Sequence, residues 1–206
     1  MEKQINLKHK IGQGITPDQF MESMQIRVME LSKIPNTKEQ MIANYENFTW
    51  MIKEDKQFFS ALGELSNLYC LILCTDWCPD VIWNVPVLFR LMEESLIPTE
   101  VLVMEEHLET MDLFLTDGGR AQPVAILLEA DTGNVLGRWG ARPAYIQAVM
   151  DRFKKDNPNK QAQNYQANLN QAYSDIGSQY HNGREYQKVM IQELKELITP
   201  IVSYYK

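Results

Sequence analysis

The chain has 206 residues, 45% of them hydrophobic, and a formal net charge of -7. A chain of this length buries one sizeable core and carries additional elements. It contains no run of eighteen apolar residues, as a membrane span requires, and residues 1–6 lack the apolar stretch of a signal peptide. The excess of acidic residues lies before residue 150, which argues against a nucleic-acid partner because such a partner needs a clustered basic face. We therefore expect a soluble, cytoplasmic protein with no nucleic-acid or membrane partner.

The first third of the sequence predicts helices. Thr16-Pro17-Asp18-Gln19 has the pattern of a capping box with proline at the first helical position. Apolar residues then follow at helical spacing: Phe20, Met24, Val28 and Leu31. A second capping box, from Thr37 to Gln40, predicts another helix, whose apolar face continues through Met41, Tyr45, Phe48, Ile52, Phe58, Phe59, Leu62 and Leu65.

The middle of the sequence alternates between predicted strands and helices. Residues 68–74 form a short continuous apolar run, which is typical of a central strand buried on both faces. Further strands are predicted at 100–104, 123–128 and 135–139, and helices at 81–96, 108–115 and 144–153. This order of elements predicts an α/β fold in which a mixed sheet lies between helices.

The tail has a different composition. Eleven of the 26 residues from Asn157 to Asn182 are Asn or Gln, a bias that is also typical of disorder. Apolar residues nevertheless keep helical spacing before and after Asn182-Gly183, which predicts a helical hairpin packed on the body or on a second subunit, giving a homodimer through the C-terminal helices. The predicted division is an N-terminal helical extension (1–39), a central domain (40–153) and a C-terminal helical hairpin (154–206).

All three cysteines lie within nine residues, a clustering that does not match a secreted disulfide framework. Cys78 lies where the strand at 68–74 gives way to a helix, and a helix N-terminus favours a thiolate. The alternative is a structural cysteine in a strand–helix turn. Cys70 and Cys74 lie on one face of the predicted strand, where free cysteines pack as small hydrophobes. Cys74 has a second interpretation, as a disulfide partner of Cys78, which requires Cα atoms about 4.4–6.8 Å apart.

Other chemistry-bearing residues give weaker signals. Residues 105–109 read Glu-Glu-His-Leu-Glu, but a polar cap leading into a helix explains them better than a metal site, so neither a metal nor a cofactor is expected. Arg120 and Arg142 border the predicted site. They are interpreted either as holders of an anionic substrate group or as ordinary solvated loop arginines.

Three segments in the middle of the chain resemble the thioredoxin superfamily. Trp-Cys-Pro-Asp-Val-Ile-Trp-Asn-Val-Pro-Val-Leu, starting at Trp77, is similar to the thioredoxin active-site helix, with Cys78 on the attacking cysteine and Pro86 on the kinking proline. Residues 118–124 resemble the cis-proline loop, and residues 133–141 the hairpin and terminal glycine that follow it. The resemblance covers residues 40–153. It implies a thioredoxin-like fold, a cis Gln122–Pro123 peptide bond and a substrate groove formed by Trp77, Pro79, Gln122 and Pro123.

The departures from the family pattern bear on function. The second cysteine of the family aligns with Val81, and its buried acid aligns with Ile72. Dithiol chemistry between residues 78 and 81 is excluded because valine has no sulfur, and Asp80 places a negative charge near Cys78 that opposes thiolate formation. One hypothesis is a monothiol redox protein, a thiol–disulfide oxidoreductase acting through Cys78 on protein thiols or on small thiols such as glutathione. The alternative is a non-catalytic binding module that keeps the groove.

Overall fold

The sheet of the computed structural model, which describes residues 4–63 and 67–204, has four strands. They are β1 (Leu68–Cys74), β2 (Thr99–Val103), β3 (Val124–Glu129) and β4 (Val135–Gly140), in the spatial order β2-β1-β3-β4. β1 pairs in parallel with β2 and antiparallel with β3, and β4 pairs antiparallel with β3. The expected α/β fold with a mixed sheet is therefore confirmed.

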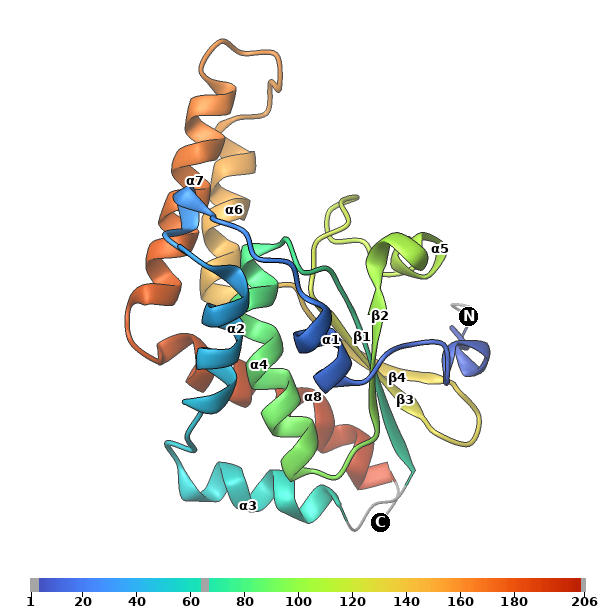
Figure 1. The fold of residues 1–206 in the computed structure, drawn as a ribbon. Coiled ribbons are helices and arrows are strands. Elements are labelled where there is room, and N and C mark those ends of the chain that lie inside the picture. The colour runs from blue at the N-terminus through green and yellow to red at the C-terminus, as the bar shows by residue number, and fades with distance from the viewer. Residues whose placement is uncertain (1–3, 64–66, 205–206) are drawn as a thin grey trace.

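Helices surround this sheet (Figure 1). In chain order they are α1 (Pro17–Ser23), α2 (Thr37–Glu46), α3 (Lys53–Leu62), α4 (Pro79–Glu94), α5 (Leu108–Met111), α6 (Ala144–Asp156), α7 (Tyr165–His181) and α8 (Glu185–Tyr204). In the described part of the chain, three short 3-10 helices accompany them: η1 (Lys8–Lys10), η2 (Glu30–Ser32) and η3 (Met104–Glu106). Among the residues with described positions, no helix is both long and apolar enough to cross a membrane.

The central strand β1 is buried on both faces, as its continuous apolar sequence predicts. Successive side chains of a strand point to opposite faces of the sheet. Cys70, Ile72 and Cys74 accordingly pack in the large core beneath the helices, whereas Leu71 and Leu73 pack in a smaller core on the other face. The smaller core is completed by the N-terminal segment and the region around α5, through Leu7, Met104, Met111 and Phe114.

The two tail helices pack on the body of the same chain, so the prediction that the tail folds as two helices is confirmed, but each helix packs mainly on other elements rather than on the other tail helix. α7 lies against α6 and η2, and α8 lies against β4 and α3. Glu193 of α8 ties these elements together: its carboxylate accepts hydrogen bonds from Trp139 Nε1 (2.7 Å) and from the backbone N–H of Ala144 at the start of α6 (2.7 Å). The apolar stripes belong to the main core, through Ala172, Ile176, Tyr180, Tyr186, Met190, Ile191, Leu194, Ile198 and Val202. Dimerisation and the three-part division of the chain stay predictions.

The N-terminal region departs from the helix expected to run to Leu31. The capping box at Thr16 is present, but α1 ends at Ser23, and Met24 leaves the helix with extended backbone angles. Val28 and Leu31 are therefore not on a buried helical face; their side chains are 68% and 45% exposed. The physical reason is a set of polar contacts to the segment after Met24, which the side chains of Asp76 and Thr37 make.

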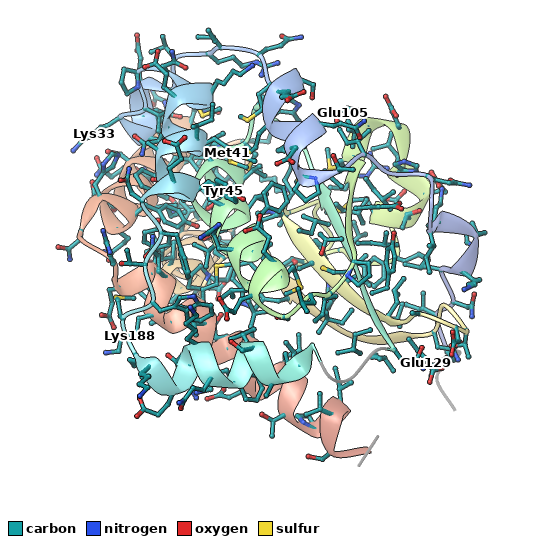
Figure 2. The ribbon with its side chains drawn as sticks, turned by 60° about the horizontal axis from the view of Figure 1, so that its bottom comes forward. Lys33, Met41, Tyr45, Glu105, Glu129 and Lys188 are labelled. Atoms are coloured by element: carbon teal, nitrogen blue, oxygen red, sulfur yellow. The ribbon has the colours of Figure 1, made fainter. Side chains whose placement is uncertain are left out.

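The next helical stretch is divided in two. α2 is capped by the side chain of Asn36 rather than by Thr37, and it ends at Glu46; α3 begins separately at Lys53. On α2, Met41 is fully buried, while Tyr45 lies beside α4 and hydrogen-bonds Glu93 (Figure 2). The expected helix at 108–115 is also shorter, because α5 has four residues. Leu65, predicted to extend the apolar face, lies outside the described residues.

Candidate functional site

Cys78 lies at the N-terminus of α4, directly after the loop that leaves β1. It is the N-cap residue, and Pro79 occupies the first helical position, where a missing N–H costs nothing. The Cys78 side chain is partly exposed, whereas Cys70 and Cys74 are fully buried. Cys78 is therefore the most accessible of the three thiols, as expected, and all three are free.

The loop before β3 faces Cys78. The Gln122–Pro123 peptide bond is cis, and the Gln122 carbonyl oxygen lies 3.7 Å from Cys78 Sγ, within reach of a weak S–H hydrogen bond. The Gln122 side chain is buried and donates from Nε2 to Thr75 Oγ1 (3.0 Å). Its Oε1 is buried without a hydrogen-bond partner. The loop thus presents a backbone carbonyl to the sulfur and is anchored to the β1–α4 turn by a side chain.

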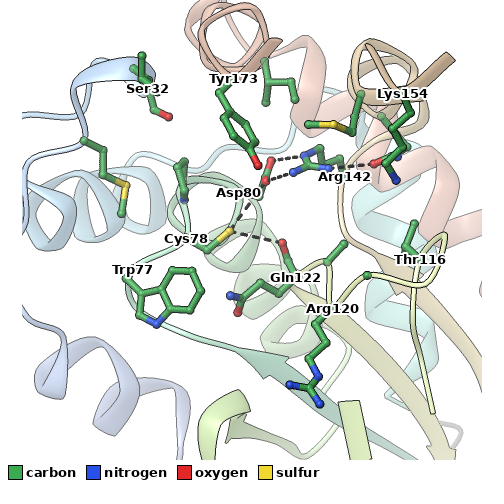
Figure 3. Close-up of a pocket in the computed structure, with 18 of the residues that line it drawn as sticks. Ser32, Trp77, Cys78, Asp80, Thr116, Arg120, Gln122, Arg142, Lys154 and Tyr173 are labelled. Atoms are coloured by element: carbon green, nitrogen blue, oxygen red, sulfur yellow. Dashed lines mark hydrogen bonds and ion pairs between the residues drawn. The ribbon is translucent and has the colours of Figure 1, made fainter. Parts of the chain in front are cut away.

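Cys78 opens into a cavity of about 750 Å³. Its floor combines the start of α4 with the loop at residues 119–122 (Figure 3). Its walls come from residues 28–32 near the N-terminus and from α6 and α7, through Gln147, Met150, Lys154, Tyr173 and Ile176. The expected groove is therefore part of a partly open pocket bounded by two walls.

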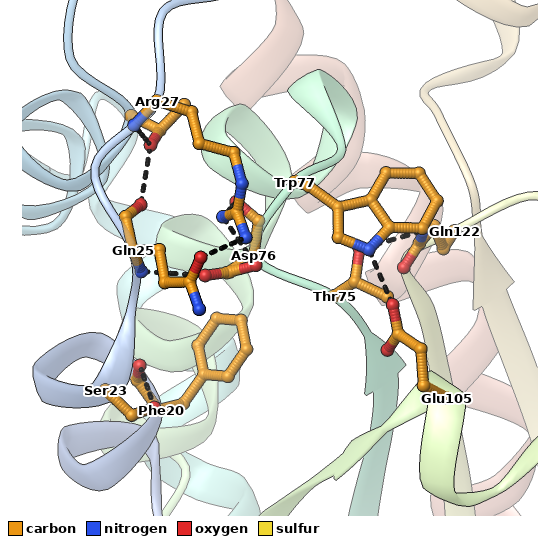
Figure 4. Close-up of polar contacts among 10 residues, drawn as sticks. Phe20, Ser23, Gln25, Arg27, Thr75, Asp76, Trp77, Glu105 and Gln122 are labelled. Carbon is orange, nitrogen blue, oxygen red and sulfur yellow. Dashed lines mark hydrogen bonds and ion pairs between the residues drawn. The ribbon is translucent and has the colours of Figure 1, made fainter.

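Asp76 holds the N-terminal wall in place. Its Oδ2 accepts a hydrogen bond from the backbone N–H of Gln25 (2.7 Å), and its Oδ1 pairs with the Arg27 guanidinium (2.7 Å; Figure 4). Thr37 Oγ1 adds two contacts, accepting from the Arg27 N–H (3.1 Å) and donating to the Gln25 carbonyl (3.1 Å). These contacts replace continued helix after Ser23 and lead the chain across the mouth of the pocket.

The second wall depends on close contact between α7 and η2. Gly177 faces Ser32 so closely that a Cβ at residue 177 would lie 2.9 Å from Ser32 Cα. The ring of His181 lies one turn further along α7, with Nε2 3.0 Å from the Ser32 carbonyl oxygen. Glycine at position 177 therefore lets the two walls meet.

A buried charged network supports Cys78 from beneath. Asp80 is 3% exposed and pairs bidentately with Arg142, through Nε–Oδ1 (2.8 Å) and Nη2–Oδ2 (2.7 Å). The hydroxyl of Tyr180, on α7, donates to Asp80 Oδ1 (2.8 Å) and accepts from Asn84 Nδ2 (2.8 Å). Burying a carboxylate is unfavourable unless it is paired and hydrogen-bonded, and these partners meet that need.

The electrostatics of the site favour a neutral Cys78 thiol. Burial and, to a lesser extent, the Asp80 carboxylate, whose Oδ2 lies 3.9 Å from Sγ, together raise its pKa to about 12. The Arg142 charge and the backbone N–H groups of Val81 and Asp80 act in the opposite direction and only partly offset these effects. The thiolate expected from a helix N-terminus is thus not the favoured form near neutral pH.

The remaining predicted residues divide into two groups. Trp77, Pro79, Arg120 and Gln122 line the cavity, and Trp77 is 47% exposed with Nε1 donating to Glu105 Oε1 (2.5 Å). Pro123 is buried behind Gln122 and Cys74 is buried in the core, so neither lines the cavity. Within residues 4–63 and 67–204, no cluster of three His, Cys, Asp or Glu side chains is arranged to hold a metal ion.

Both arginines border the site but already have carboxylate partners. Arg120 forms a bidentate pair with Asp112, at 2.7 Å and 2.9 Å, on the exposed side of the cavity. Arg142 pairs with Asp80 inside it. Arg120 therefore behaves as a solvated, paired loop arginine, and Arg142 as part of the buried network.

Sequence reasoning missed the walls and the role of Tyr180. The stripe at Phe20, Met24, Val28 and Leu31 was compatible with a longer helix, and Tyr180 was compatible with an ordinary apolar stripe. One available signal was Asp76, a charged residue directly before Trp77 in a turn that leaves a buried strand. Such an acid needs a partner, but the sequence does not say which one.

Comparison with known proteins agrees with the fold. The crystal structure of an HIV epitope scaffold superimposes with a TM-score of 0.60 at 15% identity, covering 95% of this chain and 99% of that one. A protein of unknown function from Pseudomonas aeruginosa gives a TM-score of 0.55 at 17% identity, covering 84% and 96%. These identities support the fold alone. No curated protein sequence matches. The thioredoxin family model matches residues 18–154, more than half of the chain, and the chain therefore belongs to the thioredoxin family.

Proposed function

We propose that this protein carries out single-thiol exchange at Cys78. One observation carries the proposal: a partly exposed sulfur lies at the α4 N-terminus, on the floor of a cavity and opposite the Gln122–Pro123 loop. An accessible sulfur beside a cavity is where a bound disulfide would meet a nucleophile.

The reaction needs one protein sulfur and an external thiol. The Cys78 thiolate attacks a disulfide R–S–S–R′, the new bond Cys78–S–S–R forms, and R′–S⁻ leaves and takes up a proton. A second thiol, as thiolate R″–S⁻, then attacks the mixed disulfide, forms R–S–S–R″ and restores Cys78. Residue 81 is valine and Cys74 is buried, which supports an external resolving thiol. A cytoplasmic location fits the proposal because that compartment keeps thiols reduced.

The neutral state of the Cys78 thiol determines how fast it is expected to attack a disulfide. Because burial and Asp80 raise the pKa of Cys78 to about 12, little thiolate is present near neutral pH, and the attack is slow unless a bound substrate changes the surroundings of the sulfur.

Trapping of the mixed disulfide tests the proposal. The reduced protein is incubated with a low-molecular-weight disulfide, and the adduct is mapped by mass spectrometry after proteolysis. We expect one adduct, at Cys78, that is absent from Cys78→Ser and retained by Cys74→Ser. Loss of the adduct in Cys74→Ser would instead place the chemistry at the buried cysteine.

A second candidate function is a binding module in which Cys78 forms no covalent bond. The specific observation in its favour is the raised pKa of Cys78, since a neutral thiol packs and donates weakly rather than attacking. The same trapping experiment separates the two functions. A folded protein whose Cys78 forms no adduct with any disulfide, even in alkaline buffer, would leave only the binding module.

A further inference from the structure

We propose, on the basis of single-thiol exchange at Cys78, that the cavity accepts a small, uncharged, apolar thiol or its disulfide. A cysteine on a folded protein and an anionic thiol such as glutathione would be poorer substrates. Three properties of the cavity lead to this substrate class: the two walls that flank it, the apolar side chains around it, and the pairing of its charges.

The two walls limit the size of a reaction partner. The cavity volume, about 750 Å³, lies in the range of about 300–1,000 Å³ that is usual for small-molecule pockets. Residues 28–32 form one wall and Tyr173 and Ile176 another, and both walls belong to elements packed against each other at Gly177. A disulfide on a folded protein surface would have to reach past both walls to contact the sulfur.

Apolar side chains gather around the opening. Val28 and Leu31 on one wall are 68% and 45% exposed, Trp77 on the floor 47%, and Tyr173 on the other wall 39%. They come from three distant parts of the chain, yet they line one cavity (Figure 3). Exposed apolar surface gathered at one concave site marks a place where an apolar group binds.

Each cationic side chain among the described residues that line the cavity already has a carboxylate partner. Arg142 is paired with Asp80 and Arg120 with Asp112, and Lys154 contacts Asp117 at 2.9 Å. Figure 3 also shows Arg120 pointing away from Cys78. A further acidic side chain, Glu30, lines the cavity. A carboxylate on the ligand would have to compete with these carboxylates for a cation, whereas a neutral ligand would not.

The test compares two chromogenic disulfides. One is 4,4′-dithiodipyridine, which is uncharged above neutral pH, and the other is 5,5′-dithiobis(2-nitrobenzoate), which carries a carboxylate on each ring. For each reagent, the rate of reaction with the native protein is divided by the rate of reaction with the urea-unfolded chain. This division removes the intrinsic reactivity of the reagent. We expect this normalised rate to favour the uncharged reagent by about tenfold or more, the scale of electrostatic discrimination at a partly desolvated site. Glutathione disulfide and the disulfides of insulin serve as the anionic and protein substrates, and both should react more slowly still.

A variant with a smaller side chain in one wall tests whether the walls limit access to Cys78. Tyr173→Ala widens the opening and should raise the relative rate with insulin several-fold. Leu113→Ala, at a 52% exposed apolar residue outside the cavity, is the matched control and should leave every ratio unchanged.

Two outcomes distinguish the inference from the function on which it rests. A normalised rate that is equal for the two reagents, or higher for the anionic reagent or for insulin, would overturn the substrate class while leaving exchange at Cys78 intact. No adduct with any disulfide would overturn the proposed exchange itself.

Discussion

The floor and the walls of the Cys78 cavity are built in different ways. The floor comes from a strand-to-helix turn and one facing loop, and its residues form compact motifs around Cys78 and Gln122. The walls come from residues 28–32 and from α7, which lie at opposite ends of the sequence and meet only in the fold. The floor fixes where the sulfur lies, and the walls determine what reaches it. Changes in the two parts should therefore have separable effects.

The largest expected effect concerns the thiol on the floor. Because its pKa is raised from 9.0 to about 12, the thiolate fraction below both values is about a thousandfold lower than for an ordinary thiol. The rate of iodoacetamide alkylation at Cys78 should rise about tenfold per pH unit from about pH 7 to about pH 10 without levelling off. Mass mapping of each cysteine against time provides the measurement. A plateau near pH 8.5 would show that the floor does not perturb the thiol.

Removing the cation beneath the floor should destabilise the whole fold. Arg142→Met leaves buried Asp80 without its counter-charge, which costs about 3–5 kcal/mol for a buried pair. Urea unfolding measures the loss, and Asp80→Asn combined with Arg142→Met should recover much of it. Arg120→Gln is the matched control because its pair is exposed, and it should leave the unfolding midpoint unchanged. An equal effect of both single substitutions would contradict the distinction between the two pairs.

Tyr180→Phe tests the link between wall and floor. It removes one hydroxyl from a buried side chain that contacts both Asp80 and Asn84, so we expect a loss of about 1–3 kcal/mol. Because that hydroxyl touches Asp80, the pH profile of Cys78 alkylation should shift as well. Tyr173→Phe, at a partly exposed residue, is the control and should change neither. A shift in stability alone would mean that α7 supports the fold without influencing the sulfur.

Gly177→Ala tests the walls alone. The new Cβ would meet the Ser32 backbone, and relieving such a clash costs about 1–3 kcal/mol. The walls should separate, so the reaction of Cys78 with insulin should become faster, while the pH profile of alkylation stays that of the native protein. Unchanged reactivity in a folded variant would show that the contact at Gly177 does not control access.

The central fold and the floor of the cavity could be predicted from the sequence because both depend on local patterns. The run at 68–74 predicted β1 through its continuous apolar character, and the resemblance around Cys78 and Pro123 predicted the facing loop. The tail helices were predictable for a similar reason, since the stripe after Gly183 has regular spacing.

The walls were not predictable because they depend on distant contacts, and the state of the thiol was left open because local effects on it oppose each other. Apolar residues at helical spacing from Phe20 favoured one helix, but Asp76, some fifty residues later in the chain, binds the Gln25 backbone and Arg27 and outweighs that preference. For Cys78, the helix N-terminus favoured a lowered pKa and Asp80 a raised one, and burial, which depends on the rest of the fold, has the largest effect. Neither outcome follows from local spacing alone.

The hydrogen bond from Tyr180 to Asp80 has a consequence for biosynthesis. During translation Asp80, at the start of α4, emerges a hundred residues before Tyr180, its hydroxyl donor. The N-terminal wall also emerges long before Gly177, against which it packs. Domains generally fold as units during synthesis, but here the last wall arrives with α7. A nascent chain that ends before α7 carries a less covered Cys78, and in ribosome-bound chains of increasing length the reactivity of Cys78 should fall to its native level only once residue 180 has left the exit tunnel.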